Sequence, residues 1–315
     1  MSINGTLNLC KPSGRTSFDI VRLVRKLTQQ KRVGHGGTLD PLASGVLPIC
    51  IGQATRVTEF LAEADKSYEA QVVLGVATDT YDSEGKVVER GDPSSVTYEV
   101  MQEALQSFRG PIEQMPPMFS ALKHQGKRLY ELARAGVVVE RKKRSTIIHR
   151  LEVVKWEHPL VILEVTCGRG AYIRSLVDDL GRALGCGAHL KNLVRLRTGP
   201  FDIRDSMELE EFTPAVEQGR WQDFLYPVDF ALQGLDAAII DQRSERAALS
   251  GQPVAVVYSN IAEGGQVADR LLTAAPGDGS PFKCRAYSAD GRFLALLSSP
   301  GPRGPWAPKK VFSLG

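Results

Sequence analysis

The sequence lacks the residue patterns that hold a metal ion or close a disulfide framework. Its five cysteines are far apart and odd in number, no CxxC pair occurs, and the five histidines show no HExxH spacing. Zinc sites and disulfide-rich scaffolds need ligands of these types at short, regular spacings. We therefore expect no metal, and cysteines that serve as small buried residues in a reducing compartment.

Long hydrophobic runs are also missing. The longest largely apolar stretches, such as Leu160–Val165 with its single acid Glu164, have the length of a strand, whereas a membrane-spanning helix needs ~18 apolar residues. The opening segment MSINGTLNLCKP shows no basic flank followed by an apolar region, which is the pattern of a secretory signal. We expect a cytoplasmic protein that does not bind membranes.

The phosphate-binding loops of nucleotide-dependent enzymes are absent as well. No Gly-Lys-Ser/Thr follows the glycines at 34–37, which excludes a Walker loop, and the GxGxxG spacing of dinucleotide enzymes does not occur. The acids of TDTYDSEG at 78–85 lack the spacing of a calcium loop, so this run is interpreted as the turn of a hairpin. A nucleotide-binding metabolic enzyme is therefore disfavoured.

What the sequence does contain is the composition of a folded protein of about two domains. Hydrophobic residues make up 43% and charged residues 24% of the 315 positions, which excludes a disordered chain. Strands, helices and hairpins alternate up to about residue 235, and short β-like runs between Gly-, Pro- and Ser-rich segments follow. We expect an α+β domain at 1–235 and a small all-β domain at 236–315.

Hydrophobic periodicity and turn residues place the individual elements. Ser17 is the expected N-cap of the first helix, with Phe18 on its buried face, and Val100 is expected to face inward from a later helix. The predicted helices are 17–29, 55–64, 97–108, 127–135 and 174–184, and the predicted strands are 7–10, 68–76, 87–88, 151–156, 160–167, 254–258, 284–287 and 293–297.

Charges are segregated along the chain, although the net charge is only +3. Seven basic residues and one acid lie between positions 10 and 35, and nine basic residues and two acids lie between 120 and 150. Acids outnumber bases by twelve to four over 59–113 and by eleven to three over 202–245. This segregation is typical of a surface that binds a phosphate backbone, but solvated helix faces without a partner would give the same pattern.

The stretch GHGGTLDPLASG at 34–45 is the first candidate site. Three glycines in four positions let a ligand approach the main chain closely. Asp40 stands before Pro41, which biases the backbone of Asp40 toward extended geometry. A lone carboxylate on a rigid loop can act as a nucleophile, and Asp-Pro also opens ordinary Asx turns. The local sequence leaves both interpretations open.

Two further stretches carry candidate residues. CGRGAYIRSL at 167–176 runs from a strand through a Gly-x-Gly loop into a helix, and Arg174 there either pairs with a carboxylate or lies on the helix surface. Tyr68 begins a strand in DKSYEA at 65–70, where it is either a half-buried strand residue or an aromatic side chain that stacks on a nucleobase.

Together these segments resemble the TruB family, the bacterial tRNA pseudouridine-55 synthases. The long motif GHGGTLDPLASGVLP at 34–48 is similar to the catalytic-aspartate motif of pseudouridine synthases. Ala171 stands where the family often has threonine, and the part after residue 235 matches less clearly. Over about residues 5–230, four more segments are similar to this family in order and separation: KPSGRTS (11–17), DKSYEA (65–70), SALKHQGKRLYELAR (120–134) and CGRGAYIRSL (167–176).

The resemblance implies a fold and a reaction. The fold is the pseudouridine synthase fold, a large mixed and mainly antiparallel sheet with flanking helices, followed by a small PUA-like RNA-binding domain. The reaction is the isomerisation of uridine 55 in the T-loop of tRNA: the base is flipped out, the N1–C1′ bond is broken, and uracil is rejoined through C5. It requires no cofactor, metal or ATP. The implied partner is the T-arm of tRNA, with no obligatory protein or guide RNA, and we expect a monomer.

The resemblance also assigns roles to individual residues. Asp40 is the implied catalytic carboxylate and Arg174 its ion-pair partner, while Tyr68 would stack on the uracil and accept a proton. Tyr172 and Leu193 would line the pocket, and His35 would insert into the T-loop. Lys11 and Pro12 would support the floor of the site.

Two other functions are compatible with much of this pattern. A non-catalytic RNA chaperone would open the elbow of tRNA without chemistry, and the intact set of Asp40, Tyr68 and Arg174 favours catalysis over this alternative. A guide-RNA-dependent relative would need partner proteins and a larger C-terminal domain. The compact region after Leu235 and the segment at 120–134 favour the stand-alone form.

Overall fold

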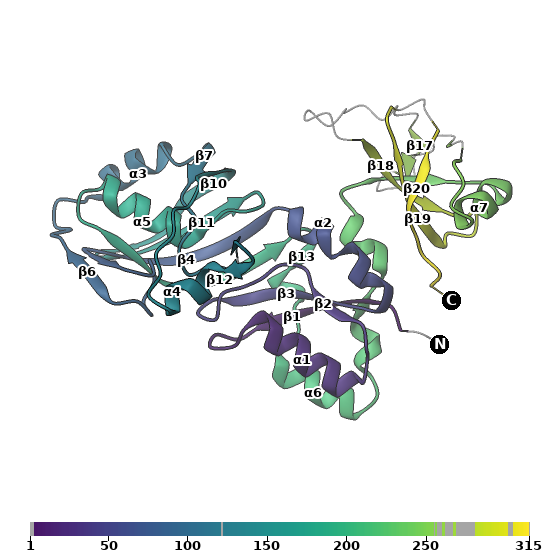
Figure 1. Cartoon of the computed structure of the whole chain (residues 1–315), viewed down its shortest axis with the longest axis horizontal. Helices are drawn as coiled ribbons and strands as arrows, with labels where there is room; N and C mark the ends of the chain where they lie inside the picture. Colours follow the sequence, from purple (N-terminus) through teal and green to yellow (C-terminus); the bar gives the residue numbers. More distant parts are fainter. Residues whose placement is uncertain are drawn as a thin grey trace.

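The computed structural model describes residues 3–120, 122–254, 256, 260–261, 267–268, 281–301 and 305–314. A ten-stranded sheet forms the centre of the larger part (Figure 1). Its main path follows the spatial order β14 (Leu225–Tyr226), β1 (Gly5–Lys11), β3 (Ser44–Ile51), β12 (Ala188–Thr198), β4 (Lys66–Leu74), β11 (Leu160–Cys167), β10 (Arg144–Glu157) and β7 (Gly110–Gln114). The remaining two strands are β13 (Phe201–Asp202) beside β12 and β2 (Val33–His35) beside β3.

Neighbouring strands of this sheet run antiparallel, except for β3 and β12, which are parallel. The expected large, mixed and mainly antiparallel sheet is therefore confirmed. Two hairpins lie outside it, β5 (Val76–Thr78) with β6 (Val87–Arg90), and β8 (Lys123–His124) with β9 (Lys127–Arg128). The first hairpin contains the turn expected at 82–85, and Gly75, with φ +86°, separates it from β4.

Helices cover one face of the half of the sheet that contains β11. Every second side chain of β11 points toward this face. Val161, Leu163 and Val165 are fully buried, while the residues between them are half-exposed, as expected for a strand with one covered face. The covering helices are α3 (Tyr98–Gln106) and α5 (Ile173–Ala183), which contact each other as well as the sheet. Met101 of α3 points into this core, but Val100 is 43% exposed, so the inward orientation expected for it is wrong.

The other half of the sheet is buried on both faces, and β3 shows why. Its sequence SGVLPICI is an almost continuous apolar run. Leu47 and Ile49 pack toward α1 (Ser17–Thr28) and α6 (Leu209–Glu217), which lie side by side in Figure 1. Val46 and Cys50 face the opposite core, which contains η1 (Gly52–Val57), α2 (Thr58–Glu63) and η4 (Val228–Leu232). The shorter elements η2 (Ile203–Asp205), η3 (Trp221–Phe224) and α4 (Leu129–Arg134) complete this part.

The N-cap of the first helix lies one residue earlier than the sequence suggests. Thr16 is the N-cap, and its side chain and that of Asp19 form a capping box, so the prediction of Ser17 as N-cap is wrong. Ser17 is buried and its hydroxyl is used elsewhere, as described below. Phe18 is 57% exposed rather than buried, because the inward face of the helix consists of Ile20, Val21 and Val24.

The C-terminal part has its own four-stranded sheet, in the order β15 (Asp236–Ile239), β18 (Phe282–Tyr287), β19 (Phe293–Ser299) and β20 (Ala307–Val311). Strands dominate this part, but the expectation of an all-β domain is wrong, because it includes a helix, α7 (Gln242–Leu249), capped by Asp241. A short pair, β16 (Asn260–Ile261) and β17 (Val267–Ala268), completes it. Of the strand expected at 254–258, Val254 bridges Trp306, and most of the rest lies outside the described residues.

The two parts share a packed interface on the α2 side of the larger sheet (Figure 1). Phe293 and Phe312 from the small sheet join the core around η1 and η4. The Lys310 ammonium lies 2.6 Å from a carboxylate oxygen of Glu59, and the Tyr287 hydroxyl donates to Asp229 over 2.5 Å. Apolar burial and polar contacts together fix the small sheet against the larger part.

Candidate active site

The Asp40 loop, residues 36–43 between β2 and β3, presents its carboxylate from a main-chain turn. The amide of Ala43 donates to the carbonyl of Asp40 over 3.1 Å, with Pro41 at the second position of the turn, where its fixed φ fits. Because the main chain closes this turn, the carboxylate remains available. Its side chain is 42% exposed and points toward Arg174.

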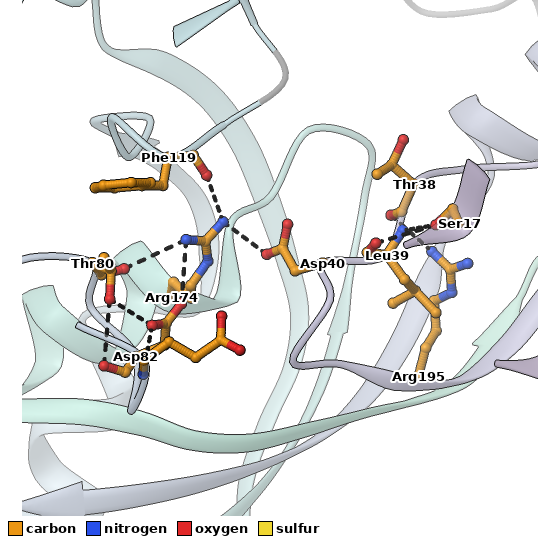
Figure 2. A network of polar contacts seen from close by, with 10 residues as sticks. Ser17, Thr38, Leu39, Asp40, Thr80, Asp82, Phe119, Arg174 and Arg195 are labelled. Carbon is orange, nitrogen blue, oxygen red and sulfur yellow. Dashed lines mark hydrogen bonds and ion pairs between the residues drawn. The ribbon is translucent and has the colours of Figure 1, made fainter. Parts of the chain in front are cut away.

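Residues of the KPSGRTS segment hold the Asp40 loop in place. The amide of Gly14 donates to the Pro41 carbonyl over 2.8 Å. The Ser17 hydroxyl both accepts from the Leu39 amide, at 2.8 Å, and donates to the Leu39 carbonyl, at 3.1 Å (Figure 2). These bonds fix the main chain on both sides of Asp40, which explains why two segments distant in sequence act as one unit.

Lys11 and Pro12 lie beneath the same loop. The Lys11 side chain is fully buried, and its ammonium donates to the carbonyls of Pro12, Arg15 and Pro41 at 2.9, 2.7 and 3.4 Å. Burial lowers the pKa of Lys11 to about 8, and the negative charge of Asp40 opposes this shift. Lys11 therefore contacts the loop beside Asp40 directly, and Pro12 is linked to it through the Lys11 ammonium, an arrangement compatible with the supporting role expected for both residues.

Arg174, in the first turn of α5, is the direct partner of Asp40. Its Nη2 lies 2.8 Å from Asp40 Oδ2 and also donates to the Phe119 carbonyl over 2.8 Å (Figure 2). Its Nη1 lies 3.3 Å from Asp82 Oδ2 and 3.5 Å from the Thr80 carbonyl. The guanidinium is 7% exposed. A buried cation held by four acceptors therefore orients one partly exposed carboxylate.

Asp82 is the polar residue of this network that the sequence interpretation missed. It is 4% exposed, and its Oδ1 accepts from the Thr80 hydroxyl at 2.5 Å and from the Glu84 amide at 3.1 Å. The sequence showed an acidic hairpin turn, and the hairpin is confirmed. The contact with Arg174 spans 92 residues, and a local turn pattern contains no signal for such a long-range pairing.

Tyr68 lies on β4, directly opposite Arg195 of β12. The charge of the Arg195 guanidinium acts on the phenol of Tyr68. Burial raises the pKa of Tyr68 to about 12, the charge of Arg195 lowers it, and that of Asp40 raises it further. Tyr68 therefore lies within electrostatic reach of Asp40, while Arg195 was not singled out from the sequence.

Tyr172, Leu193 and His35 occupy three different surroundings. Tyr172 caps α5, where its amide and carbonyl both pair with the Gln114 side chain, and burial raises the pKa of its hydroxyl. Leu193 is 6% exposed and belongs to the core cluster that includes Leu39 of the Asp40 loop. His35 precedes this loop, is half-buried, and accepts from the Gly37 amide at 3.3 Å through Nδ1.

Neither a metal centre nor a membrane span is found in the described part of the chain. Among the described residues, no group of three or more His, Cys, Asp or Glu side chains is arranged to hold a metal ion. Within the same residues, every helix is too short or too polar to cross a bilayer.

Comparison with known proteins gives consistent matches. The model of the TruB family pseudouridylate synthase N-terminal domain matches residues 25–173, and that of the tRNA pseudouridylate synthase B C-terminal domain matches 174–233. The chain is 41% identical over 310 residues to a tRNA pseudouridine synthase B of Dehalococcoides mccartyi, with 98% of this chain and 97% of that protein covered. With the tRNA pseudouridine synthase B of Symbiobacterium thermophilum the identity is 46% over 257 residues, covering 81% and 84%.

Solved structures show the same architecture. A chain of a Cbf5–Nop10–Gar1 complex superposes with a TM-score of 0.74 at 27% identity, covering 98% of this chain and 85% of that one. A chain of an H/ACA RNP bound to a substrate RNA containing 2′-deoxyuridine gives a TM-score of 0.71 at 25% identity, with the same coverage of both chains. The structural likeness therefore extends over nearly the whole chain.

Proposed function

The chain belongs to the TruB family of pseudouridylate synthases, and we propose that its substrate is uridine 55 in the T-loop of tRNA, with Asp40 as the catalytic carboxylate. Family membership makes it a tRNA-modifying isomerase with the fold expected from its motifs. The observation that carries the assignment of Asp40 is its 2.8 Å ion pair with Arg174. A fixed, partly exposed carboxylate on an anchored loop has the properties of a nucleophile.

The proposed reaction conserves atoms and electrons without a helper group. The N1–C1′ bond breaks, a C5–C1′ bond forms, C5 loses a proton and N1 gains one. The oxidation state of the nucleotide does not change, so neither a redox cofactor nor ATP is needed. Asp40 acts on the ribose or on the base, and Arg174 positions its carboxylate throughout.

The proposed pocket for the flipped base lies between the two tyrosines and the Asp40 loop. The charge of Asp40 acts on the hydroxyls of both Tyr68 and Tyr172. Tyr68 offers an aromatic face for stacking, and Leu193 packs in the same core cluster as the loop. In this proposal His35 enters the space that the flipped base leaves in the T-loop, while Lys11 and Pro12 support the floor.

Basic residues near this pocket are the proposed contacts for the tRNA backbone. Lys142, Lys143 and Arg144 are exposed, and the charge of Arg144 acts on the Tyr172 hydroxyl. Apart from this pocket, a hollow of about 430 Å³ on α1 is lined by Arg15, Arg22 and Lys26 together with Leu23 and Asp19, and we propose it as a second phosphate contact. Cations beside a reactive pocket position RNA through its phosphates, which carry no sequence information. Residues 236–315 are proposed as a PUA-like domain that adds further RNA contacts.

Release of tritium from a tRNA transcript labelled at C5 of uridine tests the assignment. Wild-type protein should release tritium, and Asp40→Asn should abolish the release while tRNA binding survives. A transcript with cytidine in place of uridine 55 should release nothing above background. Equal release from wild type and Asp40→Asn would remove Asp40 from the mechanism, and release that persists without uridine 55 would refute the assigned position.

The same assay separates the remaining alternatives. The similar solved structures include a Cbf5–Nop10–Gar1 complex and an H/ACA RNP bound to a substrate RNA. We propose that this chain acts as a monomer without guide RNA, so the purified protein should turn over an unmodified transcript by itself. Activity that appears only after an RNA or protein is added would favour the guide-dependent form. tRNA binding and refolding without tritium release would favour a chaperone.

A further inference from the structure

Arg195 is a buried cation to which the proposed chemistry gives no role. Its side chain is 1% exposed. Arg195 forms no ion pair with any residue that the structure describes. Its guanidinium donates instead to the carbonyls of Val46, Gly37 and Thr38 at 2.7, 3.1 and 3.4 Å. A charge that is buried without a counter-ion is costly. Three carbonyls satisfy its donors only in part, since a guanidinium carries five N–H groups.

The remaining partner of this guanidinium is the phenol of Tyr68. Arg195 and Tyr68 face each other across the antiparallel ladder of β12 and β4, so their side chains lie on the same face of the sheet. On its other side, Arg195 pairs with Gly45 of β3, where a Cβ would lie 2.3 Å from the Arg195 carbonyl oxygen. The arginine is therefore held tightly between the strand of Tyr68 and the Asp40 loop.

This geometry suits a tyrosine that works in its deprotonated form. A guanidinium cannot accept a hydrogen bond, so toward the phenol oxygen it can act only as a donor. If Tyr68 loses its proton, the buried cation gains the counter-ion that it otherwise lacks. The other groups that act on the hydroxyl are Cys167 of β11 and Asp40, and both oppose ionisation. Arg195 is therefore the group that favours the phenolate.

We propose that Arg195 is a positioning residue that prepares Tyr68 as the base for the C5 proton. This inference rests on the proposed function and deepens it. After uracil is rejoined through C5, the C5–H bond breaks and its electron pair forms the C5–C6 double bond of the ring. The N1–C6 double-bond pair returns to N1, which takes a proton from solvent, and the C5 proton passes to the Tyr68 phenolate. Solvent then takes this proton and regenerates the phenolate beside Arg195.

The test compares Arg195→Gln and Arg195→Lys with a matched control, Arg197→Gln. Arg197 lies on the same strand and donates to the Gly199 carbonyl and the Ser67 hydroxyl, at 3.1 and 3.5 Å. The single-turnover rate of tritium release is measured for each protein between pH 6 and 10, with Tyr68→Phe as the protein that lacks the proposed base. Filter binding gives the tRNA affinity.

Loss of the guanidinium removes the charge that favours the phenolate, so a smaller fraction of Tyr68 is ionised at every pH between 6 and 10. Because this range lies below the pKa of Tyr68, the rate should rise with pH in every protein, and at each pH the rate of Arg195→Gln should fall about tenfold for each unit by which the pKa of Tyr68 rises. tRNA affinity should change little, the rate of Arg195→Lys should fall less than that of Arg195→Gln, and Arg197→Gln should match wild type. A rate of Arg195→Gln that equals wild type, or a wild-type rate that does not rise with pH over this range, overturns the proposal.

Replacement of Tyr68 by 3,5-difluorotyrosine, whose phenol is more acidic, supplies a rescue that a purely structural role would not produce. In the Arg195→Lys protein, which keeps a charge and is the variant expected to fold best, this replacement should restore the rate toward wild type. No recovery overturns the inference. Absence of tritium release from wild-type protein would instead contradict the proposed function itself, so the two failures are distinguishable.

Discussion

Replacement of Asp82 by asparagine removes one of the two carboxylates that hold Arg174. The side chain keeps its size, and its carbonyl oxygen can still accept from the Thr80 hydroxyl and the Glu84 amide, which both bond to Oδ1. Its amide nitrogen then faces Arg174 Nη1, where Oδ2 now lies at 3.3 Å. The new amide nitrogen and Arg174 Nη1 are both hydrogen-bond donors, so the contact between positions 82 and 174 is lost.

The structure sets the size of the effect. Removal of one partner from a buried ion pair costs about 3–5 kcal/mol. Arg174 keeps the Phe119 carbonyl and Asp40, each at 2.8 Å. The lost contact is also longer than the 2.7–2.9 Å usual for charge-assisted bonds. We therefore expect a loss of about 2 kcal/mol in the free energy of unfolding, the value typical of one hydrogen bond to a charged group.

Turnover should fall because the guanidinium moves relative to Asp40. A decrease of about ten- to a hundredfold in the single-turnover rate corresponds to about 1.4–2.8 kcal/mol of activation free energy. Tritium release measures this rate, filter binding measures tRNA affinity, and urea unfolding measures stability. Asp79→Asn is the control, since Asp79 is an exposed acid at the start of the same turn and accepts from the Lys86 amide. Equal losses in both variants, or full activity of Asp82→Asn, would refute the reasoning.

Three other perturbations test the same framework. Arg174→Lys keeps the charge but loses the fork that reaches Asp40 and its other acceptors, so the rate of tritium release should fall about tenfold or more while tRNA affinity in filter binding stays nearly constant. Lys66 is buried with its pKa lowered from 10.5 to about 8. Between pH 8 and 10.5 the unfolded chain therefore binds more protons than the folded protein. Raising the pH from 7 to 10.5 should stabilise wild type relative to Lys66→Met by about 2 to 3 kcal/mol, as measured by urea unfolding. No change in this difference would contradict the burial of the charge. Gly45→Ala should lower the melting temperature and the rate together, because a Cβ there would lie 2.3 Å from the Arg195 carbonyl oxygen at a φ of +99°; an unchanged melting temperature would refute this.

Much of the fold could be predicted from local sequence where one pattern decides the outcome. β11 alternates buried and half-exposed residues along its length, and the helix that follows it begins at Ile173, one residue from the expected start. The long motifs also located Asp40 and Arg174, because each sits at a defined place in a contiguous segment. α7 was missed because most of its residues are polar and Ala248 is its one buried side chain, although Asp241 provides a normal N-cap.

The polar network could be predicted only in part, because two of its residues are defined by tertiary contacts. Asp82 lies in a turn whose local pattern is fully explained by the hairpin, and its ion pair with Arg174 depends on how that hairpin packs. The exposed position of Phe18 has a similar cause. It stands at the start of α1, where the spacing of apolar residues is ambiguous, and the packing of Ile20 and Val24 decides which face is buried.

Arg195 escaped prediction because β12 changes phase along its length. Ala188 and Leu190 are buried at the start of the strand, and strict alternation would then bury position 192 and expose 193 and 195. The pairing with β4 shifts between Leu190 and Asn192, an irregularity that reverses which side chains face inward. Leu193 and Arg195 consequently share the buried face with Tyr68. The same irregularity therefore turns both Leu193, which was expected in the pocket, and Arg195, which was not, toward the site. In a strand without it, Arg195 would point away from the site into solvent.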